Sequence, residues 1–337
     1  MRSIFLTGIS GFLGKNIVLK LLEQKDIEII GLVLPNEKNL EFYKKDNIHL
    51  IEGNILNKDD IERFLSYQSK GDKYLIHAAG MISVYKHRDP LVTKINVDGT
   101  KNVIDSCLNK NFKKVIYVSS VDSLPKAKGN NPISEPDSFD IKKVDGVYSK
   151  SKVLANNYVL EVAKKTDLNI SIICPSAIMG PNDPFLAPIN VAIKRFLNDK
   201  LPAITKGGYN IVDVRDVAEG TILALTKGRN KESYLLTGEY ISVKDLIGLT
   251  AKVSNKKPIN KKVPHFIIKI ASPFIELHCK LRHKKPLFTG FSMDCLMQNS
   301  NYSNKKAQTE LGYKARPIID TLTDTINWMK ESGYLDK

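Results

Sequence analysis

Cysteine is scarce in this chain, and its copies lie far apart. Cys107, Cys174, Cys279 and Cys295 form no CxxC pair and no other spacing that is typical of metal ligands. No metal site is therefore expected. Cys107 and Cys174 stand within apolar patterns, which predicts that both are small residues of a hydrophobic core.

Long hydrophobic runs are also missing. No uninterrupted apolar stretch approaches the roughly 20 residues that a membrane-spanning helix needs. The longest candidate, residues 266–281, is interrupted by Lys269, Pro273, Glu276 and His278. The start of the chain runs directly into a strand-like segment and does not resemble a signal peptide. We therefore expect a cytoplasmic protein without membrane spans.

Acidic residues are in the minority, with 36 Asp and Glu against 51 Lys and Arg, which gives a net charge of +15. Most of the basic excess is lysine, and it is spread over the whole chain. A nucleic-acid-binding surface would cluster such residues and interleave them with aromatic side chains, so no nucleic-acid partner is expected. The densest cluster, residues 278–285, is interpreted as an exposed helix end, with contact to an anion or a membrane as the alternative.

The sequence does contain a regular alternation of strand-like and helix-like segments up to about residue 175. Short apolar runs alternate with segments of helical periodicity. Strands are predicted at 4–7, 28–33, 49–51, 74–78, 115–118 and 170–173, and helices at 12–22, 91–108 and 147–165. Because these strands are apolar almost throughout, they are expected to lie in a parallel sheet that helices cover on both faces.

The second half of the chain has shorter and less regular elements. Residues 1–175 are therefore predicted to form an α/β domain, and residues 176–337 a smaller C-terminal lobe that mainly binds the substrate. The chain is expected to return to the first sheet around residues 205–240, since 211–214 and 234–236 are again strand-like.

A glycine-rich turn joins the first predicted strand to the first predicted helix. Residues 7–14 read TGISGFLG, and Gly8, Gly11 and Gly14 allow the backbone to turn sharply and to approach a pyrophosphate closely. The N-terminus of the following helix offers unpaired N–H groups and a partial positive charge to the phosphates. This position between strand and helix predicts a dinucleotide-binding Rossmann domain with a doubly wound parallel sheet.

Three polar residues form a candidate catalytic site. Tyr148 and Lys152 are four residues apart in a predicted helix and so lie on one face. The phenol has an ordinary pKa of about 10, which a neighbouring ammonium and the positive charge of an oxidised nicotinamide would lower toward the working range. Ser120 follows the strand predicted at 115–118, at the edge where a parallel sheet binds its ligands. Its hydroxyl can therefore hydrogen-bond a substrate oxygen beside the tyrosine.

These motifs resemble those of the extended short-chain dehydrogenase/reductases, in particular the subgroup related to dihydroflavonol 4-reductase and the NAD-dependent epimerase/dehydratases. The resemblance covers nearly the whole chain. The matching segments are residues 7–14, 77–80, 96–102, 118–120, 148–152, 175–181, 212–218 and 310–317. The resemblance implies that Ser120 orients the substrate oxygen, that Tyr148 is the general acid/base, and that Lys152 binds the nicotinamide ribose and tunes the tyrosine.

The cofactor is expected to be NADP(H), with NAD(H) as the alternative. Leu34 stands near the position where relatives carry Asp for NAD or Arg for NADP, and Lys38, Lys44 or Lys45 could reach a 2′-phosphate. Asn54 replaces the Asp that is common in relatives, and its amide can still hydrogen-bond adenine. The residues expected to bind the cofactor are Gly8, Gly11, Phe12, Leu13, Gly14, Lys38, Asn54, Ile55, Ala78, Ala79, Gly80, Asn96, Tyr148, Lys152, Pro175 and Ile178.

The leading hypothesis is a carbonyl reductase or alcohol dehydrogenase that acts on a small-molecule carbonyl or alcohol. A sugar-nucleotide epimerase or dehydratase would use the same catalytic residues, but Cys174 replaces the Arg that many epimerases carry before Pro175. A non-enzymatic NAD(P)-binding regulatory protein is the alternative from another class. It is disfavoured because such relatives typically lose the catalytic Tyr or Lys. The substrate is left undetermined, and a homodimer is left open.

Overall fold

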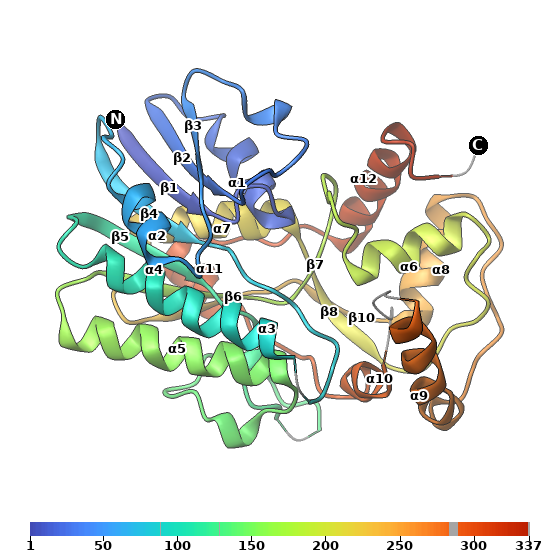
Figure 1. Ribbon diagram of the computed structural model, residues 1–337. Coiled ribbons are helices and arrows are strands. Elements are labelled where there is room, and N and C mark those ends of the chain that lie inside the picture. Colours follow the sequence, from blue (N-terminus) through green and yellow to red (C-terminus); the bar gives the residue numbers. More distant parts are fainter. Residues whose placement is uncertain (88, 128, 283–288, 336–337) are drawn as a thin grey trace.

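The computed structural model describes residues 1–87, 89–127, 129–282 and 289–335. Its larger part is a seven-stranded parallel sheet with strand order β3-β2-β1-β4-β5-β6-β9 (Figure 1). The strands are Arg2–Thr7 (β1), Ile27–Val33 (β2), Ile48–Glu52 (β3), Asp72–His77 (β4), Phe112–Val118 (β5), Ile170–Pro175 (β6) and Ser233–Leu236 (β9). The predicted Rossmann sheet is confirmed, and each strand predicted before residue 175 overlaps an observed one.

Helices cover both faces of this sheet because its strands are apolar on both sides. Ile4 and Phe5 of β1 point to opposite faces, and both are 0% exposed. One face is covered by α1 (Phe12–Leu21), α7 (Val214–Lys227) and α11 (Lys305–Leu311), and the other by α2 (Lys58–Leu65), α4 (Thr100–Cys107) and α5 (Val147–Lys165). The alternation of strands and helices read from the sequence therefore produces two cores, one on each side of the sheet.

The helix predicted at 91–108 is interrupted in the structure. It consists of α3 (Pro90–Thr93), a π-helical segment η2 (Lys94–Gly99) and α4. The π-helical segment packs closely against the loop after β3, since a Cβ at Gly99 would lie 2.6 Å from the Ile55 side chain. Single π-helical turns often occur at functional sites, and this one follows the loop that leaves β4.

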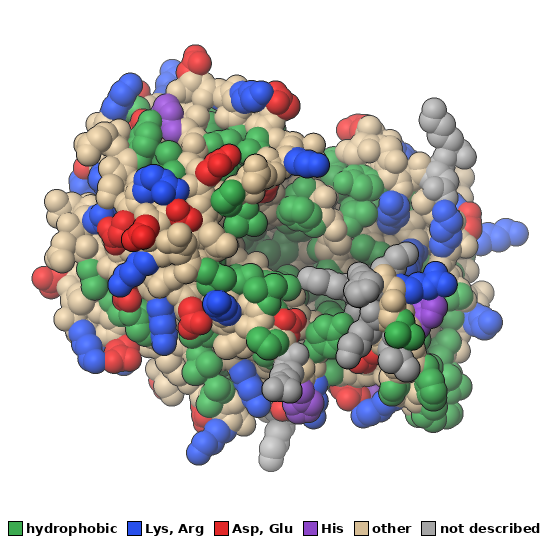
Figure 2. All heavy atoms as spheres, viewed as in Figure 1, with side chains coloured by type: hydrophobic (Ala, Val, Ile, Leu, Met, Phe, Trp, Pro, Cys, Tyr) green, Lys and Arg blue, Asp and Glu red, His purple; other side chains and the backbone are tan. Residues whose placement is uncertain are grey.

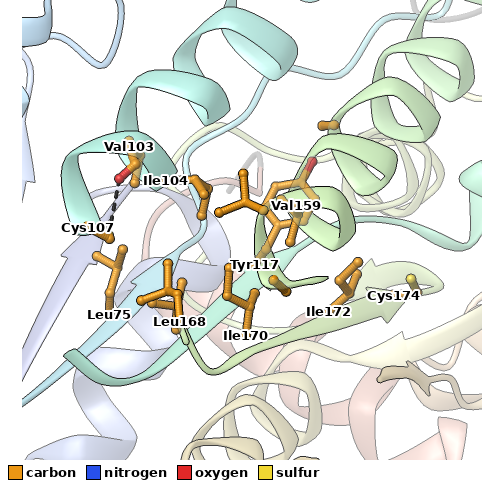
Figure 3. Close-up of a cluster of buried hydrophobic side chains, with 14 of the residues drawn as sticks. Leu75, Val103, Ile104, Cys107, Tyr117, Val159, Leu168, Ile170, Ile172 and Cys174 are labelled. Atoms are coloured by element: carbon orange, nitrogen blue, oxygen red, sulfur yellow. Dashed lines mark hydrogen bonds between the residues drawn. The ribbon is translucent and has the colours of Figure 1, made fainter. Parts of the chain in front are cut away.

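Two of the four cysteines belong to the core, as predicted. Cys107 and Cys174 are 1% and 0% exposed, in the cluster between the sheet and helices α4 and α5 that Figure 3 shows. Cys107 Sγ donates a hydrogen bond to the Val103 carbonyl oxygen at 3.1 Å (Figure 3). Burial raises the pKa of the Cys174 thiol to about 12, so it remains a protonated, unreactive packing residue.

The second lobe lies beside the carboxyl ends of the large sheet's strands, to the right in Figure 1. It contains a three-stranded sheet in which β8 (Gly208–Asp213) is antiparallel to β10 (Glu239–Ser242) and parallel to β7 (Ala177–Met179). Its helices are α6 (Pro188–Leu197), α8 (Val243–Val253), α9 (His265–Leu281), α10 (Gly290–Leu296) and α12 (Ile318–Glu331). After β8 the chain returns to the large sheet, where β9 pairs with β6.

The remaining short elements are the 3-10 helices η1 (Glu41–Tyr43), η3 (Val121–Ser123) and η4 (Ile141–Lys143). Within the described ranges, no helix is long and apolar enough to cross a membrane. The same residues include no group of three His, Cys, Asp or Glu side chains that could hold a metal ion.

Candidate active site

The glycine-rich turn between β1 and α1 forms a tight backbone cradle. Gly8 has a φ of 72°, in the left-handed region that favours glycine, and a Cβ there would lie 2.8 Å from Ala79 N. A Cβ at Gly14 would lie 2.0 Å from the Gly8 carbonyl oxygen. Only glycines allow the turn to approach both the loop after β4 and the first turn of α1. The predicted cofactor residues Gly8, Gly14, Ala78 and Ala79 are thereby brought together.

The N-terminus of α1 opens onto this cradle. Gly11 caps the helix without a side-chain hydrogen bond, and its first turn contains no acidic residue. Phe12 and Leu13 are partly exposed. The first N–H groups of a helix have no partners within the helix and carry a partial positive charge. Together with the cradle, these N–H groups fit the pyrophosphate of a dinucleotide.

Ser120 and Tyr148 meet at the carboxyl edge of the sheet. Ser120 follows β5, is 7% exposed, and accepts a hydrogen bond from the Asp122 N–H at 3.1 Å. Its hydroxyl donates to Asp122 Oδ2 at 3.4 Å and lies close enough to Tyr148 to influence the pKa of the phenol. Tyr148 lies in the first turn of α5, after Gly146, whose φ of 89° again requires glycine. A strand end and a helix start thus place two hydroxyls side by side.

The Tyr148 phenol holds its proton firmly in the cofactor-free site. Burial raises its pKa above the ordinary value, the negative charge of Asp122 adds to the rise, and the neighbouring Ser120 hydroxyl opposes it. The sequence-based expectation of a lowered pKa included the positive charge of an oxidised nicotinamide. Without that charge burial dominates, so the tyrosine is a protonated phenol at neutral pH.

Lys152 lies one turn further along α5, with its ammonium buried beneath the sheet edge. It is 4% exposed, and Nζ donates to the Val118 carbonyl oxygen at 2.9 Å. The ammonium also lies 5.1 Å from the centre of the Tyr117 ring. Burial lowers the pKa of Lys152 to about 8. A Cβ at Gly80 would lie 3.4 Å from Nζ, so the loop after β4 and the lysine are neighbours, as the cofactor prediction requires.

Asn96, in the π-helical segment, connects that loop to α5. Its Oδ1 accepts from Met81 N at 2.8 Å, while Nδ2 donates to the Met81 carbonyl oxygen at 2.9 Å and to Ser151 Oγ at 3.0 Å. The residue is 1% exposed. Its side chain therefore holds the loop at Gly80 against the helix that carries Tyr148 and Lys152.

The adenine side of the expected site is formed by loops after β2 and β3. Leu34 is 54% exposed at the end of β2, and its N–H donates to Glu37 Oε2 at 3.0 Å. Sequence reasoning missed this carboxylate, although its position three residues after Leu34 in a turn could have indicated it. Lys38 is exposed, whereas Lys44 is paired with Glu41 at 2.7 Å.

Other predicted cofactor residues lie along the same edge. Asn54 Oδ1 accepts from Leu56 N at 2.9 Å, and Ile55 is 8% exposed. Pro175 ends β6 beside β5, and Ile178 lies shortly after it in β7 of the three-stranded sheet. The predicted loop residues thus lie at the carboxyl ends of β1, β2, β3, β4 and β6, where parallel sheets bind ligands.

A polar group from both lobes faces Ser120 and was not predicted. Lys126 Nζ lies 3.7 Å from Asp122 Oδ1 and is hydrogen-bonded to the Tyr302 hydroxyl. Burial and the Asp122 charge raise the pKa of Cys295 to about 11, and burial with the charges of Cys295 and Asp122 raises the pKa of Tyr209 to about 12. Tyr209 and Cys295 belong to the second lobe, whereas Tyr302 packs in the core of the Rossmann domain and pairs with Ile133. The polar residues around Asp122 therefore come from distant parts of the chain.

A hollow separates the Rossmann sheet from the second lobe, and Figure 2 shows hydrophobic side chains on its walls. A distinct pocket of about 980 Å³ lies between residues 204–207 and 296–301. Its lining includes none of Ser120, Tyr148 and Lys152. This pocket therefore lies apart from the predicted catalytic residues.

Comparison with known proteins agrees with this geometry. Residues 4–237 match the NAD dependent epimerase/dehydratase family. A Synechocystis protein with the provisional name dihydroflavonol 4-reductase is 27% identical, over 98% of this chain and 95% of its own length. The decarboxylating sterol-4-alpha-carboxylate 3-dehydrogenase of Schizosaccharomyces pombe is 25% identical, over 98% of each chain.

Among solved structures, the crystal structure of gox2253 superposes with a TM-score of 0.83 at 30% identity and covers 99% of each chain. Both the sequence match and the superposition extend through the glycine-rich turn, the strand ends and the helix that carries Tyr148. The chain belongs to the NAD dependent epimerase/dehydratase family and is an oxidoreductase of the extended short-chain dehydrogenase/reductase type.

Proposed function

We propose that this enzyme is a carbonyl reductase and alcohol dehydrogenase, in which NAD(P)(H) exchanges a hydride with the substrate carbon while Tyr148 exchanges a proton with the substrate oxygen. The observation that carries the proposal is that the Ser120 hydroxyl and the Tyr148 phenol are neighbours at the carboxyl edge of the sheet. Because burial keeps the Tyr148 phenol protonated, the residue is ready to donate its proton to a carbonyl oxygen.

The other residues position these groups. Ser120 can donate its hydroxyl to the same substrate oxygen and fix its place beside the phenol. Lys152 is charged at neutral pH even with its pKa at about 8. From its position next to Gly80 it can hold the ribose of the nicotinamide half and favour the phenolate after proton transfer. The cradle at Gly8 and the N-terminus of α1 hold the pyrophosphate.

We propose NADP(H) as the preferred cofactor. Lys38 is exposed beyond β2, and the ammonium groups of Lys15 and Lys45 lie 5.3 Å and 5.8 Å from the centre of the Phe42 ring. These charges favour a 2′-phosphate, while the Glu37 carboxylate opposes it. We therefore expect a preference of about tenfold or less, because exposed lysines contribute only modest charge-assisted contacts.

The proposal also assigns a different binding role to each lobe. Residues 1–175 would bind the cofactor, and residues 176–337 would mainly bind a small-molecule carbonyl or alcohol. Tyr209 and Cys295 support this division, since both belong to the second lobe and the charge of Asp122, which accepts from Ser120 Oγ, raises the pKa of each. The cytoplasmic location and the oligomeric state stay predictions.

The second candidate is a sugar-nucleotide epimerase or dehydratase, which the family's name favours. An enzyme of that kind returns the hydride to its own substrate, so its cofactor shows no net change. Cys174, buried in the core, occupies the position where many epimerases carry Arg. The reductase and dehydrogenase names of the two curated relatives further support net redox chemistry.

One assay separates the two candidates. Purified protein is incubated with each cofactor and with a panel of ketones, aldehydes, alcohols and nucleotide-sugars, and both product and cofactor are quantified. We expect carbonyl reduction with stoichiometric oxidation of NADPH. Turnover of a nucleotide-sugar without net change of the cofactor would overturn the reductase proposal even if Ser120, Tyr148 and Lys152 all proved essential.

A further inference from the structure

Large apolar side chains are exposed in a row along α9. Phe266, Ile270, Phe274 and Leu281 are 62%, 67%, 73% and 73% exposed, and Ile267 beside them is 45% exposed. Spacings of four and seven residues place these side chains on one face of a helix. Figure 2 shows hydrophobic surface over α9, at the lower right of the view. Single exposed apolar side chains are common, whereas a contiguous row is typical of a binding surface.

Polar contacts on the other side of α9 fix this orientation. Asp294 of α10 pairs with His265 Nε2 at 2.8 Å and with Lys269 Nζ at 3.1 Å. Ser272 is buried, and its Oγ would lie 2.7 Å from a Cβ at Gly290. Specific contacts with α10 therefore hold the helix with its apolar row turned outward.

The helix also satisfies its backbone at the internal proline. Pro273 has no N–H to donate to the Lys269 carbonyl oxygen, and the Ser272 hydroxyl donates to that oxygen instead, at 3.1 Å. An unpaired carbonyl would be costly in an apolar environment. Because Ser272 satisfies this carbonyl oxygen, the helix can place its apolar row in an apolar environment without leaving a backbone group unpaired there.

Charge identifies the partner. Lys261, Lys262 and Arg282 are exposed at the two ends of the helix, Lys269 is 59% exposed on its flank, and the chain carries a net charge of +15. A second copy of this chain would bring the same basic residues against them, whereas a negatively charged surface would attract them. An apolar row flanked by basic residues is the pattern of helices that lie in a lipid interface.

We propose that α9 docks this protein flat on a membrane that contains anionic lipids, with the apolar row among the acyl chains and the basic residues at the headgroups. At 17 residues and with Lys269 and Glu276 within it, the helix is suited to lie in the interface and not to span it. The basic cluster noted at 278–285 begins on this helix, and its residues 283–285 lie outside the described residues.

The docked helix lies close to the catalytic residues. It contacts α10. Phe291 of α10 packs against Gly146, two residues before Tyr148, since a Cβ at Gly146 would lie 2.5 Å from its ring. The proposed membrane contact would therefore bring the substrate cleft near the lipid surface. The docking proposal itself does not depend on the reaction that the cleft performs.

Vesicle flotation with the full chain tests the proposal. Vesicles of phosphatidylcholine alone are compared with vesicles in which about one third of the lipid is phosphatidylglycerol. We expect the protein to float with the anionic vesicles, at least about tenfold more than with the neutral ones, and to be released by high salt. Protein that stays at the bottom of the gradient with anionic vesicles would overturn the proposal without any variant being made.

A double variant, Ile270→Glu with Phe274→Glu, removes the apolar row at two exposed positions and should reduce flotation by about tenfold or more. Leu154→Glu, at a 41% exposed position of α5, is the matched control and should float like the wild type. Thermal unfolding checks that all three proteins are folded. The proposal would be overturned if the double variant floated as well as the wild type. It would also be overturned if the wild type did not bind vesicles but formed a dimer in sedimentation that the double variant did not form.

Discussion

Replacing Lys152 by Met should change how stability depends on pH. Burial lowers the pKa of Lys152 from 10.5 to about 8, whereas in the unfolded chain the lysine titrates at its ordinary value. Between these two pKa values the unfolded state binds more protons than the folded state. The free energy of unfolding therefore rises with pH in this window. Below the folded pKa the full cost of burying the ammonium is present.

The size of the effect follows from the same shift. A difference of about 2.5 units corresponds to roughly 3 kcal/mol over the whole window. Between about pH 7.5 and about pH 9.5, the wild type should gain roughly 2 kcal/mol relative to Lys152→Met, which has no group to titrate. Part of the burial cost at neutral pH is offset by the hydrogen bond from Nζ to the Val118 carbonyl oxygen.

Urea unfolding of the cofactor-free proteins measures this difference. Wild type, Lys152→Met and the control Lys150→Met, an exposed lysine in the same turn of α5, are compared across the pH range. The free energies of unfolding of the wild type and the control should depend on pH in the same way, and that of the wild type should rise relative to that of Lys152→Met above about pH 8. If the difference between wild type and Lys152→Met stays flat, the ammonium is solvated in the folded protein and the reasoning on its burial is wrong.

The other predictions address the remaining parts of the site. Tyr148→Phe should lower turnover by about 10² or more with little change in cofactor affinity, and retention of a third of the activity would exclude Tyr148 as the acid/base. Gly8→Ala should weaken cofactor binding measured by titration, because its Cβ would lie 2.8 Å from Ala79 N at a φ that alanine disfavours; unchanged affinity would contradict the cradle. Glu37→Gln removes a carboxylate that opposes the 2′-phosphate and should raise the ratio of NADPH to NADH affinity by up to about tenfold. An unchanged ratio would mean that the 2′-phosphate of the bound cofactor does not lie near Glu37.

Much of the fold could be predicted because each element of the Rossmann domain has a local signal. Continuous apolar runs marked strands that are buried on both faces, and β2 is buried along its whole length. The interruption of the helix at 94–99 had no such signal. A π-helical turn depends on how Asn96 and Gly99 pack against the loops after β4 and β3, and these contacts are not local in sequence.

Some residues of the candidate site have a local signal in the sequence, and others have none. Ser120, Tyr148 and Lys152 could be predicted because a strand end and a four-residue helical spacing are visible in the sequence. The hydrogen bond between Lys126 and Tyr302 could not be predicted, because Tyr302 lies 176 residues away along the chain and no sequence pattern connects the two. Side chains that the second lobe contributes depend on how that lobe sits against the sheet, and irregular elements carry little periodicity from which to predict it.

The buried ammonium of Lys152 is itself an argument for function. Nothing in the described structure neutralises it with a carboxylate, and its bonds run to a carbonyl oxygen and to the Tyr117 hydroxyl at 3.4 Å. An apolar side chain of the same length would avoid the desolvation cost. Stability alone therefore does not explain a lysine at this position. Residues that break the packing rules without local compensation tend to lie where function needs them, and this one lies beside the loop at Gly80, one helical turn after Tyr148.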